Sequence, residues 1–343
     1  MIARSYHGSR ADHLSVHRSS PWLSETMAEF AAGFADRFTP GCAAGRYAPS
    51  PSGDLHLGNL RTALLAWAFA RSTGRRFLIR IEDLDRVRPG AEQRQLDDLA
   101  AIGVDWDGPV VRQSERLPIY QSAIDGLVAA GLTYECYCTR REIQQAATAP
   151  HGPMSAYPGT CRGLDAVARA RLRDAGRPAA LRLRASTAEF DVDDDLYGHY
   201  RGPVDDVVLR RADGVPAYNL TVVVDDAAQG VDQVVRGDDL LPSTPRQAYL
   251  ATLLGLPVPR YIHVPLVLDA QGRRLAKRDG AVTLTDRRAL GDTPEDVIAV
   301  LAASLGYRAA SSSELLAGFD ARQLPHEPWI LDVKRLLQRS RCP

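Results

Sequence analysis

The pattern of apolar residues between Arg46 and Arg86 predicts a strand, a helix and a second strand in close succession. A short apolar stretch at Tyr47-Ala48 leads into a turn rich in proline, serine and glycine, and the second strand runs from 77 to 81. The apolar positions of the helix lie three or four residues apart and are Leu57, Leu60, Leu64, Trp67 and Ala68. Gly74 marks the end of the helix. This order predicts a βαβ unit, in which a helix N-terminus faces a ligand at the carboxyl ends of the strands.

The rest of the chain continues an α/β pattern with one interruption. Further helices are predicted at 114–131, 243–254 and 292–306. The apolar run 218–224 suits a strand buried on both faces, and 234–239 is predicted as another strand of that half of the fold. Between the two halves, residues 164–216 contain an arginine-rich helix and short strands, and we interpret this block as an insertion. The arginines of the helix are Arg169, Arg171 and Arg173.

The turn before the first helix carries residues suited to bind phosphate. A helix N-terminus offers free N–H groups and a favourable dipole, and His56 can donate a hydrogen bond to a phosphate oxygen. Gly58 would let a nucleotide lie close to the backbone. A lone H-x-G would indicate only a surface loop, but the string P-S-P-x-G-x-x-H-x-G-N from Pro49 to Asn59 stands between a strand and a helix. We therefore predict a nucleotide site.

Three of the five cysteines cluster, as Cys136-x-Cys138 and a later Tyr157-x-x-x-Cys161. Thiolates in a four-ligand site suit zinc. Tyrosine is an unusual ligand, so the spacing alone leaves the fourth donor open, with His151 as a competitor. Three small buried cysteines without a metal are the alternative.

Composition narrows the class of protein. Lys+Arg and Asp+Glu both number 42 in 343 residues, so a nucleic-acid partner would need a local basic patch. The length suggests two or three domains. The cysteines form no disulfide pattern and no apolar run is long enough for a membrane span, so we expect a cytoplasmic protein without membrane contact. Residues 1–45 show no clear period, and we expect a disordered extension, with Met27 as an alternative start.

The segment from Arg46 to Arg86 resembles the HIGH region of class I glutamyl-tRNA synthetases and their short paralogues. A second segment, 274–278 (RLAKR), stands where those enzymes carry their KMSKS-type loop. The resemblance implies an α/β fold: a class I synthetase Rossmann-like parallel sheet with an inserted acceptor-type, zinc-binding subdomain and a C-terminal helical stem-contact-like region. The implied domains are the N-terminal extension (1–45), the first half of the catalytic fold (46–123), the zinc-binding and tRNA-docking insertion (124–216), the second half of the fold (217–262), and the KMSKS-type loop with the helical region and tail (263–343).

The resemblance also implies the residues of the site. Glutamate brings two carboxylates and an ammonium group, which call for guanidinium groups and an acid. Glu82 would hold the ammonium group, while Arg46, Arg236 and the Tyr218 hydroxyl would bind the carboxylates, and which arginine takes which stays open. The implied glutamate-binding residues are Arg46, Tyr47, Ala48, Pro49, Ser50, Glu82, Tyr218 and Arg236. The implied ATP-binding residues are His56, Gly58, Asn59 and Lys277, with His56 and Lys277 catalytic.

Two metals are implied by the same resemblance. In the short paralogues, C-x-C with a later Y-x-x-x-C is the zinc pattern, and Mg²⁺ would accompany ATP. The implied ligands of a structural zinc ion are Cys136, Cys138, Tyr157 and Cys161. The KMSKS-type loop departs from the usual pattern, because Arg274 replaces the first lysine and Ala276 a serine, while Lys277 is retained.

The acceptor of glutamate is implied by the short length of chain after the KMSKS-type loop. Residues 279–343 are too few for the anticodon-binding region of a full glutamyl-tRNA synthetase. The short paralogues activate L-glutamate with ATP in the absence of tRNA and transfer it to queuosine in the anticodon loop of tRNA(Asp). We expect a monomer that docks tRNA on the arginines between 169 and 184. The alternatives are a truncated glutamyl-tRNA synthetase that charges the tRNA 3′ end, a nucleotidyltransferase acting on a small molecule, and a pseudo-synthetase that binds RNA or glutamate without chemistry.

Overall fold

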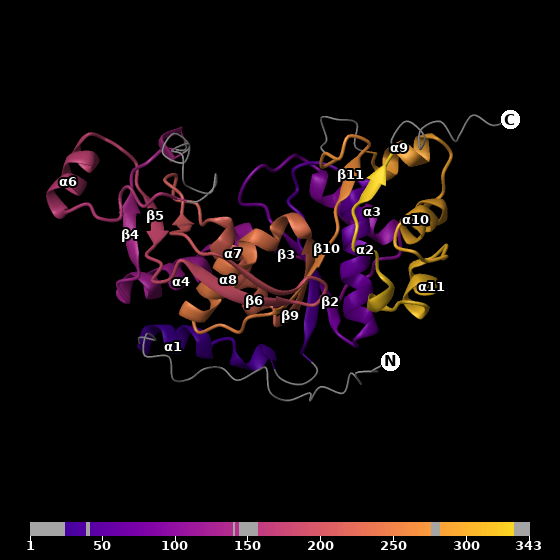
Figure 1. Cartoon of the computed structure of the whole chain (residues 1–343), viewed down its shortest axis with the longest axis horizontal. Coiled ribbons are helices and arrows are strands. Elements are labelled where there is room, and N and C mark those ends of the chain that lie inside the picture. The colour runs from indigo at the N-terminus through magenta and orange to yellow at the C-terminus, as the bar shows by residue number, and fades with distance from the viewer. Residues whose placement is uncertain (1–24, 39–41, 140, 144–156, 276–281, 333–343) are drawn as a thin grey trace.

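A mostly parallel sheet forms the centre of the molecule (Figure 1). The computed structural model describes residues 25–38, 42–139, 141–143, 157–275 and 282–332. The seven strands lie in the order β3-β2-β1-β9-β10-β6-β7, and every neighbouring pair is parallel except β6 and β7. Their bounds are β1 Ala44–Tyr47, β2 Arg76–Ile81, β3 Val111–Arg112, β6 Glu189–Asp194, β7 Gly198–Pro203, β9 Val231–Gly237 and β10 Arg260–Val264.

The βαβ unit predicted at the start of the fold is confirmed. Helix α2 (Leu57–Ser72) connects β1 to β2, which pair in parallel with Arg46 opposite Leu78. The helix is buried over most of its length because it packs on β1, β2 and β9. Gly74, in the left-handed region with φ of 68°, follows its C-terminus and turns the chain into β2, as only glycine does without strain.

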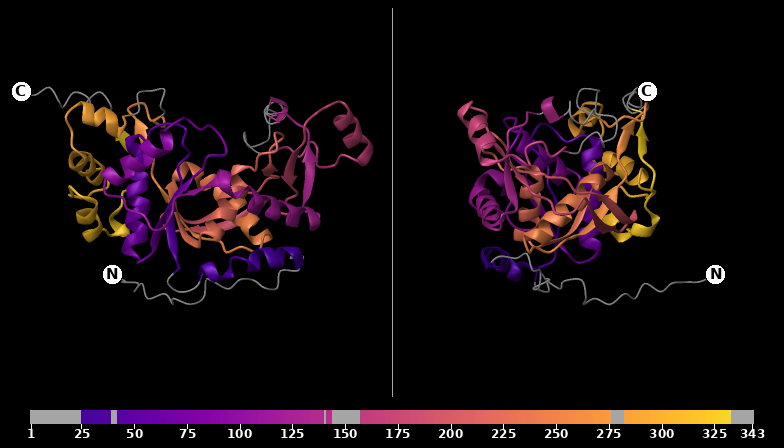
Figure 2. Two further views of the ribbon diagram at one scale, coloured as in Figure 1. Left: turned by 180° about the vertical axis from the view of Figure 1, so that it is seen from behind. Right: turned by 60° about the vertical axis from the view of Figure 1, so that its left-hand side comes forward.

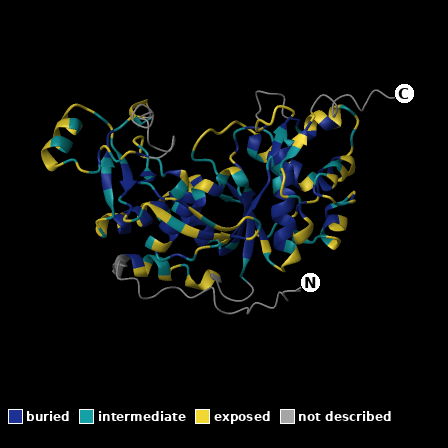
Figure 3. Cartoon of the chain, in the orientation of Figure 1, coloured by how far each residue is buried: buried dark blue, intermediate teal, exposed yellow. Residues whose placement is uncertain are grey.

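Helices cover both faces of the sheet, and buried apolar clusters lie beneath them (Figures 1 and 3). The helices whose apolar residues join one cluster are α2, α3 Ala91–Ala101, α9 Leu284–Ala289, α10 Pro294–Ala303 and α11 Ser312–Ala317. The helices that contribute to the second are α1 Glu25–Ala32, α4 Leu117–Ala129, α7 Tyr218–Ala228 and α8 Thr244–Leu253. Short 3₁₀ helices are η1 Ala35–Phe38, η2 Gln113–Arg116, η3 Asp238–Ser243 and η5 Ala321–Gln323.

The strand predicted at 218–224 is wrong, because these residues open helix α7. Every residue from Leu220 to Ala227 is buried, as the helix packs against α4, α8, β8 and β9. A short apolar run buried on all sides has no period that separates strand from helix. Tertiary packing therefore outweighs the β preference of the three consecutive valines. As a result Tyr218 stands in the first turn of a helix and not in a strand.

The inserted residues form a separate lobe at one end of the molecule (Figures 1 and 2). Strands β4 Thr133–Cys136, β5 Ala180–Leu183 and β8 Val208–Arg210 make an antiparallel sheet, beside which lies α6 Ala166–Asp174. The expected insertion 124–216 needs correction, because its hairpin β6–β7 joins the main sheet. The expected boundaries after 123 and 262 fall inside α4 and β10, respectively.

The ends of the described chain are ordered parts of the fold. Met27 of α1 is fully buried against α4, which corrects the expectation of disorder for residues 25–38. At the other end, β12 (Trp329–Leu331) pairs in parallel with β11 (Val267–Asp269). Helix α10, which the sequence predicts, lies between these two strands in the chain and is capped by Thr293. Among the described residues, no helix combines the length and the apolar character needed to cross a membrane.

Candidate active site

His56 caps helix α2 and is fixed by a reciprocal pair of hydrogen bonds. Its Nδ1 accepts from the Asn59 N–H at 3.2 Å, and the Asn59 side-chain oxygen accepts from the His56 N–H at 3.3 Å. Because Nδ1 is an acceptor, the neutral imidazole carries its proton on Nε2, the nitrogen that can donate. Two residues of the predicted nucleotide site therefore hold each other at a helix N-terminus, where an anion is stabilised.

Gly58 lies in close contact with neighbouring side chains. A Cβ atom at this position would lie 3.0 Å from the His56 ring and 3.3 Å from Cβ of Val267. Contacts this close are tighter than most in packed proteins, so a side chain here would require the His56 ring or Val267 to shift. The glycine thus makes room for the imidazole ring, a cause that adds to the close approach of a nucleotide expected from the sequence.

The turn after β1 is tied to the end of β2. The Glu82 N–H donates to the Pro49 carbonyl at 3.0 Å, and the Gln95 side chain donates to the carbonyls of Ser50 and Gly53 at 3.1 and 2.6 Å. The backbone of the predicted residues 48–50 therefore lies next to Glu82, at the carboxyl edge of the parallel sheet where ligands bind in such folds. Tyr47 contributes differently, because its side chain is buried in the apolar core.

A buried network of charges lies beneath this edge. Arg46 Nε and Arg80 Nη1 both donate to Oδ1 of Asp226, at 3.3 and 2.7 Å, and Arg80 Nη2 lies 3.5 Å from Glu82. Burial alone would raise the pKa of Asp226, but the two guanidinium groups outweigh burial and lower it. Burial raises the pKa of Glu82, against the opposing charges of Arg80 and Arg46. Arg80 and Asp226 therefore hold the side chains of Arg46 and Glu82 in place through ion pairs.

A second acid completes the network. Asp225 is fully buried and accepts hydrogen bonds from Gln113 at 2.8 Å, Arg116 at 2.6 Å and the Tyr120 hydroxyl at 2.7 Å. Its carboxylate also lies 3.7 Å from Arg80 Nε. Buried charges persist only when paired and hydrogen-bonded in this way. The acid thus links α4 and η2 to the helix that carries Tyr218.

Arg236, near the end of β9, has a different environment. Its guanidinium is buried and donates to His263 Nε2 at 3.0 Å, Gln247 Oε1 at 2.7 Å and Thr244 Oγ1 at 2.8 Å. Gln247 is in turn oriented by Asn219 of α7 at 3.0 Å. Among the described residues, no carboxylate forms an ion pair with Arg236. A buried cation surrounded by neutral acceptors is suited to an anionic ligand.

Tyr218 is influenced by the charges of both the Arg46–Glu82 network and Arg236. Its pKa is raised by burial first and then by the charge of Glu82, while the charges of Arg236 and Arg46 act to lower it. Hydrogen bonds place three of the predicted residues together, since Arg46 and Glu82 share the Arg80–Asp226 network and Arg46 Nη1 donates to the carbonyl of Val235, the residue before Arg236, at 3.3 Å. The fourth, Tyr218, stands in the first turn of α7 and is 43% exposed.

The KMSKS-type loop is described only at its flanks, and Ala276 and Lys277 lie outside the described residues. On one flank, Leu275 is buried in the apolar cluster that includes residues of α2; on the other, the Val282 carbonyl accepts from the Leu57 N–H at 2.9 Å. Thr283 forms a backbone bridge with His56. Arg274 pairs with Asp239, so the residue that replaces the first lysine of the motif contacts a carboxylate. Both flanks therefore lie close to the helix that His56 caps.

The cysteine cluster forms a compact group of sulfur and oxygen atoms. The Sγ atoms of Cys136, Cys138 and Cys161 all lie within 4.8 Å of one another. The Tyr157 hydroxyl is 3.3 Å from Cys136 and 3.6 Å from Cys138, and it accepts from the Cys161 N–H at 2.9 Å. Four ligands in a tetrahedron around zinc would be about 3.8 Å apart, given Zn–S bonds of about 2.3 Å. The donor set fits zinc, whereas the competitor His151 lies outside the described residues.

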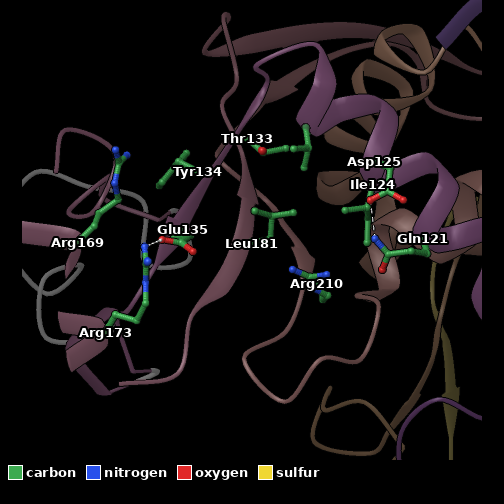
Figure 4. Close-up of a pocket in the computed structure, with 11 residues that line it drawn as sticks. Gln121, Ile124, Asp125, Thr133, Tyr134, Glu135, Arg169, Arg173, Leu181 and Arg210 are labelled. Atoms are coloured by element: carbon green, nitrogen blue, oxygen red, sulfur yellow. Dashed lines mark hydrogen bonds and ion pairs between the residues drawn. The ribbon is translucent and has the colours of Figure 1, made fainter. Parts of the chain in front are cut away.

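A cavity of about 530 Å³ lies elsewhere, between α4 and the sheet of the inserted lobe (Figure 4). Its lining includes Tyr134, Leu181 and three arginines, Arg169, Arg173 and Arg210, and Arg173 is paired with Glu135. None of the residues predicted to bind glutamate, ATP or metal lines this cavity. It is therefore separate from the candidate active site.

Sequence reasoning missed the residues beneath the site. Arg80 lies within the predicted strand 77–81, and Asp225 and Asp226 directly follow the apolar run 218–224; the sequence predicts no role for these three residues or for His263. The available signal was a charged side chain within or directly after an apolar run, since such a group has to be paired when the run is buried.

Comparisons with known proteins identify the class of the fold. Residues 44–327 match the family of class I tRNA synthetases (E and Q), catalytic domain. A solved glutamate tRNA ligase from Elizabethkingia meningosepticum, in complex with its amino acid, superposes with a TM-score of 0.72 at 27% identity, over 86% of this chain and 68% of that one. The fold and the match define a class I tRNA synthetase catalytic domain.

Curated relatives give a narrower assignment. A glutamyl-Q tRNA(Asp) synthetase from Nocardia farcinica is 73% identical over 300 residues, which cover 88% of this chain and 96% of the relative. Another from Cutibacterium acnes is 55% identical over 269 residues, or 77% of this chain and 76% of the relative. The chain belongs to the family of glutamyl-Q tRNA(Asp) synthetases.

Proposed function

We propose that this protein activates L-glutamate with ATP in the absence of tRNA and transfers it to queuosine in the anticodon loop of tRNA(Asp). The relatives named glutamyl-Q tRNA(Asp) synthetase support the overall reaction. The observation that carries the glutamate specificity is Arg236, a buried cation whose hydrogen bonds within the described residues go to neutral groups. A substrate carboxylate would supply the missing negative charge.

The two arginines are suited to different tasks. Arg46 is already bound to Asp226, so its charge is balanced before substrate arrives. Arg236 has no such partner among the described residues, and it therefore takes a carboxylate as a full ion pair. Arg46 contributes donors to the other carboxylate, and Glu82 holds the ammonium group. The backbone of residues 47–50 and the Tyr218 hydroxyl complete the glutamate site.

Activation requires positioning and charge stabilisation more than covalent help from the protein. A glutamate α-carboxylate oxygen attacks the α-phosphorus of ATP, a new acyl–phosphate bond forms, and pyrophosphate leaves. His56 donates from Nε2 to a phosphate oxygen beside the N-terminus of α2, where the helix dipole favours negative charge. Asn59 holds the His56 ring, and Lys277 is assigned to the departing phosphates. In the second step a queuosine hydroxyl attacks the acyl carbon and AMP leaves.

Two metals belong to the proposal. Cys136, Cys138, Tyr157 and Cys161 would hold zinc with all four positions filled by protein, which leaves no open site for chemistry and indicates a structural role. Burial raises the pKa of the Cys138 thiol to about 11, so metal binding at this residue has to displace a proton. Mg²⁺ would accompany ATP and supply positive charge to its phosphates.

The test is transfer of labelled glutamate, with ATP and Mg²⁺, to tRNA(Asp) with and without queuosine and to tRNA(Glu). Label only on queuosine-containing tRNA(Asp), retained after the 3′ end is removed, is the expected result. Label on the 3′ end of tRNA(Glu) would instead establish a compact glutamyl-tRNA synthetase. Absence of glutamate-dependent pyrophosphate exchange would exclude activation and favour a binding protein without chemistry.

A further inference from the structure

We infer that Asp194 and His263 are positioning residues for Arg236, which hold its guanidinium in the orientation that binds a substrate carboxylate. The inference rests on the proposed function, since it concerns the same glutamate site. Neither residue was singled out by the sequence, and both are buried. They act through Arg236 and are not assigned a contact with substrate.

The three residues form a relay of hydrogen bonds, and the Thr244 hydroxyl lies beside it, 3.1 Å from His263 Nε2. Arg236 Nε donates to His263 Nε2 at 3.0 Å, and His263 Nδ1 lies 2.7 Å from Asp194 Oδ2. The His263 backbone N–H donates to the same Asp194 oxygen at 2.9 Å. Two hydrogen bonds to one carboxylate thus fix both the position and the ring orientation of the histidine.

The relay fixes the histidine tautomer. A guanidinium can only donate, so His263 Nε2 has to be an unprotonated acceptor and the ring proton lies on Nδ1, facing Asp194. A histidine of the opposite tautomer, or a protonated one, would direct an N–H at the Arg236 N–H. The Asp194 carboxylate therefore favours the neutral ring with its proton on Nδ1, whose Nε2 accepts from Arg236 and can also accept from the Thr244 hydroxyl.

The remaining contacts leave a defined pair of donors on Arg236. Gln247 and Thr244 each take one N–H from a terminal nitrogen, so one N–H remains on each of the two. Two donors on a planar fork suit the two oxygens of a carboxylate. If Nε were not held by His263, the fork could rotate about its side-chain bonds, and the match to a carboxylate would weaken.

The position of Asp194 in the fold connects the relay to the edge hairpin β6–β7. Asp194 ends β6, the strand of the hairpin that lies within the expected insertion yet joins the main sheet beside β10. Its Oδ1 accepts from the N–H groups of Leu196 and Tyr197, both at 2.9 Å, which anchors the hairpin turn. The edge hairpin thus supports the substrate arginine of β9 through His263 of β10.

The test compares two amide replacements of His263 by steady-state pyrophosphate exchange. His263→Asn keeps an amide near Asp194 but has no acceptor that reaches Arg236, whereas His263→Gln can place its oxygen near the former Nε2. We expect His263→Asn to raise the glutamate KM about tenfold, as for loss of a hydrogen bond to a charged group. The ATP KM and kcat should stay within about twofold, and His263→Gln should recover most of the loss.

Controls separate this role from a structural one. His199→Asn, on the exposed face of β7, should leave every parameter unchanged. Thermal melting identifies variants that fail to fold; if His263→Asn is one of them, Thr244→Val removes another acceptor of Arg236 and should raise the glutamate KM in the same way. Equal effects on the ATP and glutamate KM values, or an unchanged glutamate KM in folded variants, would overturn the inference. Wild-type protein without exchange would overturn the proposed function and the inference together.

Discussion

Arg80 and Asp226 form a buried ion pair 2.7 Å long directly below the candidate glutamate site. Arg80 is fully inaccessible to solvent, and Asp226 also receives Arg46 on the same oxygen. The pair therefore connects the core of the fold to the candidate site, because Asp226 holds Arg46, the proposed glutamate ligand, and is itself held by the fully buried Arg80.

Replacement of Arg80 by methionine should destabilise the protein strongly. The change removes the cation that lies closest to Asp226, and breaking a buried pair by loss of one partner costs about 3–5 kcal/mol. Urea denaturation of Arg80→Met and wild-type protein measures the free energy of unfolding. The control is Arg86→Met, since Arg86 is exposed and forms only a loose pair with Asp85. A loss below about 1 kcal/mol for Arg80→Met would show that the network relaxes without it.

The two candidate carboxylate ligands should respond to substitution in proportion to their roles. Arg46→Ala should abolish glutamate activation, since it removes donors and also leaves Asp226 with one partner fewer. Arg236→Lys keeps the charge but loses the planar fork, and should raise the glutamate KM about 10- to 100-fold. Pyrophosphate exchange measures both. Arg260→Lys, on the exposed end of β10, is the control and should behave as wild type. Near-normal activation by Arg46→Ala would remove that residue from the site.

Asp98 should give the stability a pH dependence opposite to that of a paired carboxylate. Burial within α3 raises its pKa from 3.8 to about 6, against the charge of Arg288. Between these two values the folded state binds more protons than the unfolded chain, so the free energy of unfolding falls as pH rises from about 4 to about 6. Above that window the ionised Asp98 carries its full desolvation cost.

Asp98→Asn should therefore stabilise the protein at neutral pH, by about 1–3 kcal/mol, and flatten the decline across that window. Denaturation at a series of pH values provides the measurement. Asp97→Asn, which changes the exposed neighbouring acid, is the matched control. A destabilised Asp98→Asn at pH 7 would mean that the Asp98 carboxylate has a favourable partner in solution.

Local pattern predicted the first βαβ unit, helix α10 and the arginine-rich helix α6, because amphipathic spacing, caps and glycine stops are encoded within each element. The failure at 218–224 has a physical cause. Val222, Val223 and Val224 are apolar in any conformation, and only their packing against α4, α8 and β9 makes the segment a helix. The secondary structure of this segment is therefore determined by the elements that pack against it.

The residues of the candidate site likewise fall into those that a local pattern predicts and those that depend on distant contacts. Arg46, His56 and Glu82 are predicted from the segment 46–86, whose resemblance to the HIGH region implies their roles, and these roles stay predictions. His263 and Asp194 are not predicted, because their role depends on β6 and β10 lying side by side, 69 residues apart in the chain. Parallel pairing at such separation leaves no local signal. A charged residue within an apolar strand indicates that it has a buried partner, but the sequence does not identify that partner.

Metal content should follow the cysteine cluster. Cys136→Ser replaces a thiolate by a hydroxyl, a poor zinc ligand, and should lower both bound zinc and the melting temperature. Wild-type protein treated with a chelator should show the same lower melting temperature, because a ligand that binds the folded state stabilises it by mass action. Cys42→Ser, outside the cluster, should keep its zinc. A fully stable Cys136→Ser variant, together with purified wild-type protein that contains no zinc, would support three buried cysteines without a metal.

Docking of tRNA on the inserted lobe should depend on the arginines of α6 whose charge is not balanced. Arg173 is paired with Glu135 and Arg177 with Glu142, whereas Arg169 and Arg171 have no ion pair within the described residues. Helix α6 has no buried residue, so both of the latter can be changed without disturbing a core. Phosphate contacts release counterions and make binding depend on salt.

The double variant Arg169→Gln/Arg171→Gln should therefore bind queuosine-containing tRNA(Asp) more weakly. The slope of log K against log salt should shrink by about 1.4–1.8, that is about 0.7–0.9 for each phosphate that an arginine no longer neutralises. Fluorescence anisotropy at several salt concentrations gives both quantities. The matched control, Arg173→Gln/Arg177→Gln, removes the same formal charge. These two arginines are already paired with Glu135 and Glu142, so we expect them to contribute less to phosphate binding. Pyrophosphate exchange without tRNA should be unchanged in both double variants, since α6 lies in the lobe and not at the glutamate site. An equal loss of slope in the two would mean that the lobe acts through its net charge, whereas no loss in either would place the tRNA on another surface.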